Sequence, residues 1–219
     1  MNSLAILLWS ATAHAAPVDW TDGPHHFVEA GAQVEHATNL VVSSGWQPAE
    51  HTRFSASWST PVFLLERPVN HALHLSADRA WPVADRWQTT GRVGVGVHHS
   101  STTAMVSTAL PLHLSGTIGP RLDRGLVRLR AGVSWTPTAH LKPTDVWLQA
   151  VPDAVAGWYR GMGGWWDVAL EGGRRLGENW ALVGSAGMHL TMRGRVPMPP
   201  DDFVVPWTAD LRLRRVWTD

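Results

Sequence analysis

The sequence predicts an all-β protein: an antiparallel, up-and-down transmembrane β-barrel of eight strands, with ten strands as the alternative. Three observations favour this class. Apolar residues recur at every second position over most of the chain. Charged residues make up only 16% of the composition, well under the ~25% of ordinary soluble domains. Many of the 14 tryptophans stand near the ends of predicted strands, where a barrel would meet the membrane surface.

The N-terminus predicts a secretory signal peptide over residues 1–15. Leu4 to Trp9 forms a short apolar core, and Ala13-His14-Ala15 matches the A-x-A cleavage rule. We therefore expect export and a mature chain that begins at Ala16. Residues 16–50 are expected to form an N-terminal segment, in which "FVEAGAQVEHA" alternates and can add one strand pair. Residues 51–219 are expected to form the barrel.

Period-two alternation, interrupted by Gly, Pro, Asn and Asp clusters, predicts the strands. They cover residues 52–60, 69–78, 86–98, 104–117, 125–136, 163–174, 179–192 and 203–217. The best helical candidate, 146–159, is interrupted by Pro152 and Gly157. Connections near 82–85, 120–123 and 175–179 are short, whereas 137–162 and 193–202 are long and contain prolines. Short turns at one end and longer loops at the other are typical of transmembrane barrels.

Each predicted strand has one apolar face and one mixed, polar face. In "GLVRLRAGVSW", Val127, Leu129, Ala131 and Val133 alternate with Arg128, Arg130, Gly132 and Ser134. We expect the apolar face to meet lipid and the polar face to line the lumen. Enclosed charges are costly unless they are paired, so the lumen should hold a charge network. Its expected members are Arg92, Arg128, Arg130, Asp167, Glu171, Asp210, Arg212 and Arg214.

The tryptophans favour a membrane barrel over the alternative, a soluble exported sandwich or lipocalin-like barrel. An indole combines an apolar body with a polar N–H, which suits a membrane–water interface. The expected belts are Trp87, Trp180 and Trp217 at the periplasmic rim, and Trp58, Trp135, Trp166 and Trp207 at the outer rim. The strand from Trp207 to Trp217 would span roughly 26 Å at a tilt of ~40°, close to the ~25 Å apolar band of outer-membrane barrels.

The hairpin "GGRRLGENWALVGSAG" and the closing strand "WTADLRLRRVW" resemble the small outer-membrane β-barrel proteins of Gram-negative bacteria, the OmpA/OmpX-like group. The resemblance covers about residues 52–217. It implies an outer-membrane location, contact with outer-membrane lipid and lipopolysaccharide, and recognition of the C-terminal strand by the barrel-insertion machinery. That group usually ends in a strand with a terminal aromatic residue. Trp217 would fill this role, although Thr218 and Asp219 follow it.

One stretch, "VGVHHSST", is a weak candidate for catalysis. His98 and Ser100 share a face, and a histidine beside a serine is the start of an acyl-transfer site. The pair resembles the His-x-Ser element of outer-membrane lipid A deacylases, which follow it with an Asn and a Glu. Ser101 and Leu112 stand near those two places here. The G-x-S-x-G, H-E-x-x-H and P-loop motifs are absent, so a non-enzymatic protein is preferred.

We expect no metal and no cofactor. The inward histidines His74, His98, His113 and His189 make a metal site conceivable, but no local spacing supports one. Lys+Arg and Asp+Glu both number 18, which argues against a nucleic-acid partner. Three functions stay open: a non-enzymatic barrel whose wall and outer loops contact lipid or partners, a narrow channel for small solutes, and a lipid A acyl hydrolase. The channel ranks lower because side chains just fill an eight-stranded interior.

Overall fold

The computed structural model describes residues 24–34, 38–49, 51–62, 69–101, 105–122, 125–192 and 207–217. The expected signal peptide, residues 1–15, lies outside the described residues, as does the connection 193–206. The strands are β1 (His25–Val34), β2 (Thr38–Ala49), β3 (Thr52–Pro61), β4 (Val69–Ala84), β5 (Trp87–Ser101), β6 (Met105–Ala109), β7 (Leu112–Leu122), β8 (Gly125–Pro143), β9 (Gly157–Arg175), β10 (Trp180–Met192) and β11 (Trp207–Trp217). A short helix, α1 (Asp145–Ala150), lies between β8 and β9.

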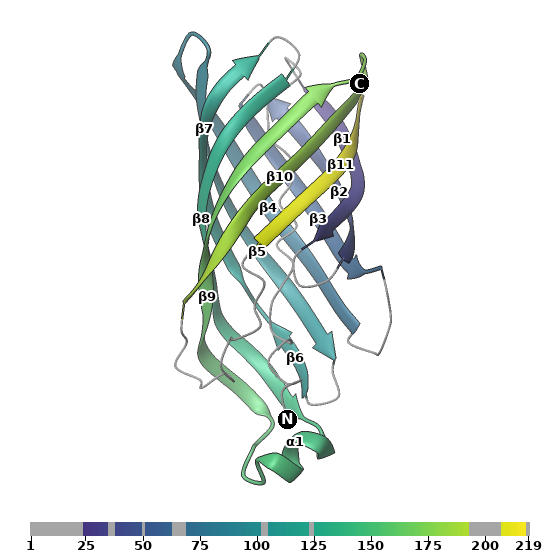
Figure 1. The fold of residues 1–219 in the computed structure, drawn as a ribbon, viewed down its shortest axis with the longest axis vertical. Helices are drawn as coiled ribbons and strands as arrows, with labels where there is room; N and C mark the ends of the chain where they lie inside the picture. The colour runs from purple at the N-terminus through teal and green to yellow at the C-terminus, as the bar shows by residue number, and fades with distance from the viewer. Residues whose placement is uncertain are drawn as a thin grey trace.

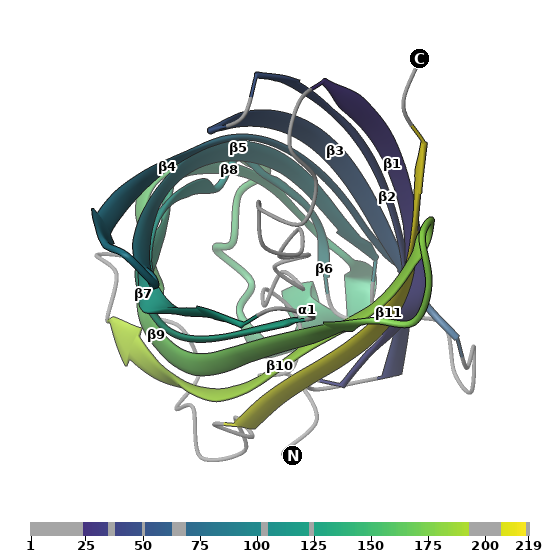
Figure 2. The same cartoon turned by 90° about the horizontal axis from the view of Figure 1, so that it is seen from above.

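The strands form one closed, antiparallel sheet (Figures 1 and 2). Neighbours in sequence are mostly neighbours in the sheet, and β1 closes the barrel by pairing with β11 from His26↔Trp217 to Val34↔Ala209. Two strands, β6 and β7, share one place between β5 and β8, with Leu110 and Pro111 separating them. The described residues therefore form a barrel of ten strands with one additional short strand.

The expectation of eight strands is wrong, and the alternative of ten is the better description. The difference arises at the N-terminus, where residues 25–34 and 38–49 form β1 and β2. These strands lie in the barrel wall, so the wall begins before the boundary at residue 51 that the sequence suggested. Ring closure needs β1, because β11 has no other partner on that side among the described strands.

The two ends of the barrel differ in their connections. At one end, here called the turn end, the connections are residues 50–51, 85–86, 123–124 and 176–179. At the other, here called the loop end, they are 35–37, 62–68, 102–104, 144–156 and 193–206. Figure 1 shows the chain's C-terminus at the turn end and α1 at the loop end. The longest connections, 144–156 and 193–206, lie at the loop end as expected, whereas 35–37 and 102–104 there are shorter than the turn 176–179.

The strands β8 and β9 are long at the loop end (Figure 1), where the sequence predicts a long loop, and β6 pairs with β8 there from Met105↔Pro143 to Ala109↔Ala139. This β8–β9 extension comprises residues 137–143 and 157–163. A register shift between Thr136 and Thr138 marks its base, and Gly161 and Gly163 opposite it have positive φ, 69° and 96°. At this bulge the single Pro137 of β8 faces two residues of β9, Gly161 and Met162, and the interrupted ladder tolerates a proline, which has no N–H.

Side chains alternate between the outside and the inside of the barrel. Along β11, Leu211 and Leu213 are exposed, whereas Arg212 and Arg214 are buried. An apolar cluster is confined to the loop end, between β6 and the β8–β9 extension; it consists of Ala109, Ala139, Leu141 and Met162, with Met105 and Tyr159 packed against it. Among the described helices, none is long and apolar enough to cross a membrane.

Candidate functional site

The barrel has an apolar outside and a charged inside. Leu129 is 53% exposed while its neighbour Arg130 is 0% exposed, and Leu211 is 57% exposed while Arg212 is 1% exposed. Most of the large apolar side chains on the wall are exposed in this way, and buried polar side chains outnumber buried apolar ones among the described residues. A water-soluble barrel or sandwich has the opposite arrangement, because apolar burial is the main favourable term in its folding.

One group of inward charges joins β1 to β11. Glu29 and Arg214 are opposite each other in the register, and Arg214 Nε donates to Glu29 Oε1 at 2.7 Å. Arg212 Nη1 lies 3.6 Å from Glu29 Oε2, and Arg212 Nε lies 3.3 Å from Asp210 Oδ1. Ser185 donates a hydrogen bond to Asp210. We call these residues the Glu29 cluster; it links the first and last strands of the barrel through ion pairs as well as backbone hydrogen bonds.

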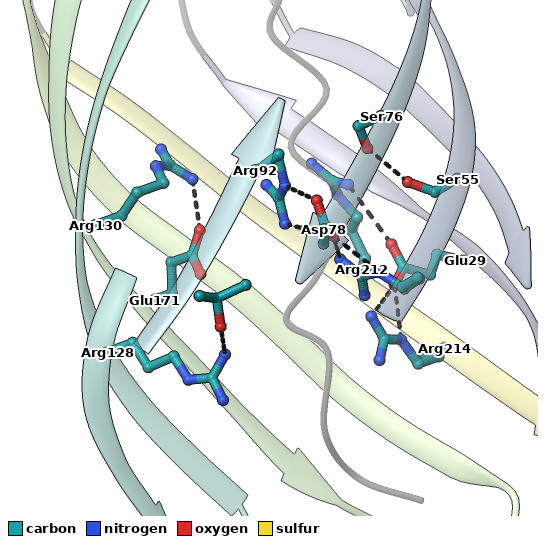
Figure 3. A network of polar contacts seen from close by, with 12 residues as sticks. Glu29, Ser55, Ser76, Asp78, Arg92, Arg128, Arg130, Glu171, Arg212 and Arg214 are labelled. Atoms are coloured by element: carbon teal, nitrogen blue, oxygen red, sulfur yellow. Dashed lines mark hydrogen bonds and ion pairs between the residues drawn. The ribbon is translucent and has the colours of Figure 1, made fainter. Parts of the chain in front are cut away.

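A second group lies across β3, β4 and β5, and we call it the Asp78 cluster. Arg53, Asp78 and Arg92 occupy adjacent register positions on these strands. Arg53 Nε donates to Asp78 Oδ2 at 3.0 Å, and Arg92 Nε donates to Asp78 Oδ1 at 2.7 Å. Asp78 thus accepts from two guanidinium groups while being only 2% exposed. Figure 3 shows Asp78 and Arg92 directed toward each other inside the barrel.

A third group, the Arg130 cluster, joins β8 to β9. Arg130 Nε donates to Asp167 Oδ2 at 2.9 Å, and Arg130 Nη1 donates to Glu171 Oε1 at 2.7 Å. On the same strand, Arg128 donates to Gln88 Oε1 at 2.5 Å and to Thr90 Oγ1 at 3.1 Å. Arg128 thus donates to two neutral groups of β5, and it lies opposite Glu171 in the register of β8 and β9. Figure 3 shows this group beside the other two.

The structure brings all eight predicted lumenal charges to the inside, distributed over these three clusters. Sequence reasoning missed Glu29, Arg53 and Asp78. Face alternation within 25–34 and 52–60 was the available signal, because Glu29 and Arg53 stand on the polar face of their strands. Phe27 was also missed: its ring lies between Arg214 Cζ at 4.8 Å and Arg53 Cζ at 5.3 Å, a cation–π contact with each. Phe27 therefore connects the Glu29 and Asp78 clusters.

Nearer the loop end, a layer of aromatic rings lines the lumen. The ring centroids of His74 and His113 are 4.9 Å apart, those of His113 and Trp165 are 6.4 Å apart, and those of Trp165 and His189 are 6.1 Å apart. Gly96 makes room for this layer, since a Cβ there would lie 2.6 Å from His74 Nδ1. Within the described part of the chain, no three His, Asp or Glu side chains are placed to hold a metal ion.

The candidate catalytic residues His98 and Ser100 both point into the barrel and are 2% and 1% exposed. Neither His98 Nδ1 nor Ser100 Oγ has a hydrogen-bond partner, so the serine is not hydrogen-bonded to the histidine. The adjacent His99 points outward, and its Nδ1 lies 3.1 Å from Thr108 Oγ1. A serine nucleophile needs a base within hydrogen-bond reach, and this geometry does not provide one.

The seven predicted belt tryptophans are all on the outer wall and 40% to 63% exposed. Trp87, Trp180 and Trp217 lie at the turn end, and Trp58 and Trp207 lie toward the loop end. Trp135 and Trp166 lie within β8 and β9, which continue past them into the extension.

Sequence reasoning missed a row of aromatic rings at the turn end. His26 stacks on Trp217 at 6.3 Å and on Trp46 at 6.4 Å, and Trp46 stacks on Phe54 at 6.5 Å. Trp81 is a further exposed indole near this end. Of the five rings, those of His26, Trp46 and Phe54 belong to β1, β2 and the start of β3. The sequence places this part of the chain outside the predicted barrel or at its margin. The turn-end belt is therefore broader than predicted.

No protein-family model matches the sequence, and no curated protein is similar to it. Several solved structures are similar in fold. Three of them are the N-terminal β-barrel domain of Pseudomonas aeruginosa OprF (10% identity, 90% of this chain and 98% of that chain, TM-score 0.40), the KdgM porin (6%, 88% and 99%, 0.43) and the translocator domain of the autotransporter NalP from Neisseria meningitidis (11%, 89% and 87%, 0.43).

Proposed function

We propose that this chain is an exported, non-enzymatic outer-membrane β-barrel that contacts lipid through its wall and other molecules through its loop end. The observation that carries the proposal is the inversion of its faces: Leu211 is 57% exposed and Arg212, its neighbour in sequence, is 1% exposed. In water this arrangement would expose a continuous apolar surface to solvent. In a bilayer the same surface meets hydrocarbon, and the closed sheet leaves no strand edge unpaired.

The proposed orientation follows from the connections. Short turns are periplasmic and longer loops are extracellular in barrels of this kind, so the turn end would face the periplasm. Lipopolysaccharide would then surround the loop end. The barrel-insertion machinery would recognise β11, whose last described residue is Trp217. Residues 1–15 would direct export and be removed, leaving Ala16 as the first residue.

Cysteine labelling along β11 tests the proposal, and the absence of native cysteine makes it direct. Single cysteines replace Ala209, Leu211 and Leu213 on the outward face, and Thr208, Arg212 and Arg214 on the inward face. A fluorophore on each outward cysteine should be quenched by a spin label in the lipid phase, and one on each inward cysteine should not. Folding of every variant is checked by heat-modifiable mobility in gels. Equal quenching on both faces, or none on either, would overturn the proposal.

A narrow channel that favours anions is a second candidate, supported by two observations. Ten strands leave a wider interior than eight. The inward arginines also outnumber the inward carboxylates among the described residues: Arg53, Arg92, Arg128, Arg130, Arg212 and Arg214 against Glu29, Asp78, Asp167, Glu171 and Asp210. Recordings in planar bilayers should give anion-selective conductance that Arg128→Gln reduces. A barrel that inserts without conductance would eliminate the channel and leave the first proposal intact.

A further inference from the structure

The outer wall has a groove of about 560 Å³ near the turn end, across β8, β9, β10 and β11. Its sides are formed by the outward side chains Val127, Leu182 and Leu211, and Arg174 lies at its margin. The lining is mostly apolar. Val127, Leu182 and Leu211 are each more than one-third exposed, so the groove opens on the face that the proposed function places in lipid.

Two outward glycines make this hollow. Gly172 of β9 and Gly184 of β10 are opposite each other in the register and both line the groove. A Cβ added to Gly172 would meet only the Leu126 carbonyl oxygen, at 3.9 Å, so the space above it is open. A Cβ on Gly184 would lie 2.6 Å from the Asp210 carbonyl oxygen, so this position requires glycine. The floor of the groove is therefore bare strand backbone at Gly172, whereas at Gly184 the Cδ1 atom of Leu211 lies 3.3 Å from where a Cβ would be.

A second pair of outward glycines on the wall shows a different arrangement. Gly91 of β5 and Gly116 of β7 are also opposite each other. There the ring of Trp81 lies over Gly91, 3.1 Å from where its Cβ would be. An aromatic ring that covers glycine backbone fills the gap with the protein's own side chain. No described side chain covers Gly172 in this way, so the groove is left to a molecule from outside the chain.

The chemistry of the lining identifies the kind of occupant. A hollow in a membrane-facing wall loses dispersion contacts unless something fills it, and a flexible hydrocarbon chain fits an open apolar groove. Arg174 at the margin is exposed and can pair with a phosphate. Arg215, on the adjoining strand β11, has its Cζ 5.7 Å from the Trp180 ring and adds a second cation at this end of the wall. Among the described residues of the connection 176–179, Glu178 is acidic. A ligand that has an acyl chain next to a phosphate group is a phospholipid.

We propose that the groove floored by Gly172 and Gly184 binds one acyl chain of a phospholipid, with Arg174 holding its phosphate. This inference rests on the proposed function, because it needs the wall in lipid. In that orientation the turn end faces the periplasm, so the bound lipid belongs to the inner leaflet of the outer membrane. The position of the site along the membrane normal favours phospholipid, because lipopolysaccharide would surround the opposite end of the barrel.

Native mass spectrometry of the folded full chain in detergent tests the proposal, with phosphatidylglycerol added as the probe. The wild-type protein should retain one lipid per chain. Gly172→Leu should fill the groove and weaken binding about tenfold or more, a change equal to ~1.4 kcal/mol. Its matched control is Gly116→Leu, also on the outward face, where a Cβ would meet only the Thr90 carbonyl oxygen at 3.7 Å. This control should bind lipid like the wild type.

A second pair of variants tests the phosphate contact. Arg174→Gln should weaken lipid retention, whereas Arg79→Gln should not, although Arg79 also lies beside an outward indole, 6.0 Å from the Trp81 ring. Three results would overturn the proposal: no lipid retained by the wild type, equal binding by Gly172→Leu and Gly116→Leu, or a wild-type dimer that Gly172→Leu dissociates while no lipid is bound. The cysteine labelling described above does not depend on this groove at Ala209 and Leu213, which do not line it. It distinguishes failure of the lipid site from failure of the barrel proposal.

Discussion

Leu211 and Arg212 are adjacent in sequence and meet opposite environments. We predict that Leu211→Arg lowers the free energy of unfolding by ~2–4 kcal/mol, because it places an unpaired cation on the lipid-facing wall near mid-strand. Arg212→Leu should still insert, because Glu29 still accepts a hydrogen bond from Arg214 and Asp210 still accepts one from Ser185. Urea titration of the protein folded in vesicles measures both, with Ala209→Leu as the outward control. A Leu211→Arg variant as stable as the wild type would contradict the lipid-facing assignment.

Asp78 accepts from two arginines, so its charge matters more than its size. We predict that Asp78→Asn costs about 3–5 kcal/mol, because it leaves Arg53 and Arg92 facing each other in a buried site without their shared carboxylate. Asp153→Asn, in the exposed connection after α1, is the control and should have little effect. The same urea titration applies. An Asp78→Asn midpoint equal to that of the control would show that the cluster contributes little to stability.

Ser100 allows a direct test of the hydrolase alternative. Its Oγ has no hydrogen-bond partner and is not activated by His98. We predict that Ser100→Ala leaves lipid A composition unchanged. Mass analysis of lipid A from cells with the wild-type gene, the variant and no gene measures this. An acyl-chain modification present with the wild type and lost with Ser100→Ala would establish the enzyme.

At the scale of single strands, face alternation was predictable and strand pairing was not. Side chains of a strand alternate with a period of two whatever its neighbours are. Arg128, Arg130, Arg212 and Arg214 could therefore be assigned to the inside from sequence alone. Their partners depend on which strands lie side by side. Glu29 and Arg214 are 185 residues apart in sequence, and no local pattern joins them.

Prolines misled the prediction of strand length. Pro137 and Pro143 suggested that the strand ended near residue 136, yet β8 continues to Pro143. The structure accommodates Pro137 at the register shift and Pro143 at the last position of the strand. Pro111, by contrast, lies in the interruption between β6 and β7. A proline therefore marked a bulge, a strand end or a break, and the sequence alone could not separate the three.

The β8–β9 extension should be separable from the rest of the barrel. Gly163 has φ of 96°, a conformation that a β-branched residue adopts only with strain. We predict that Gly163→Val makes the extension cleavable by protease in intact vesicles while the unfolding midpoint of the barrel stays unchanged. Gly157→Val is the control, because it has negative φ and a Cβ there would meet nothing within 4 Å. Equal protease resistance of the two variants would contradict a role for this glycine.

For the whole molecule, closure depends on the contact between the first and last described strands. We predict that Glu29→Gln slows folding into vesicles, because the Glu29 cluster forms only when β1 meets β11. Asp78→Asn is the informative comparison, since Arg53 and Arg92 lie 25 and 14 residues from Asp78 and need no ring closure. The rate at which heat-modifiable protein appears measures folding. Equal slowing by the two variants would show that closure is not the slow step.

The pairing of β1 with β11 also governs the order of events during biogenesis. Because the chain is made from its N-terminus, Glu29 and Phe27 are present long before Arg214, the residue that contacts both of them. Before β11 pairs with β1, the sheet has two open edges and Glu29 lacks its contact with Arg214, a state that would be costly in hydrocarbon. If the wall lies in a membrane, as proposed, a helper would have to shield both edges until β1 and β11 pair.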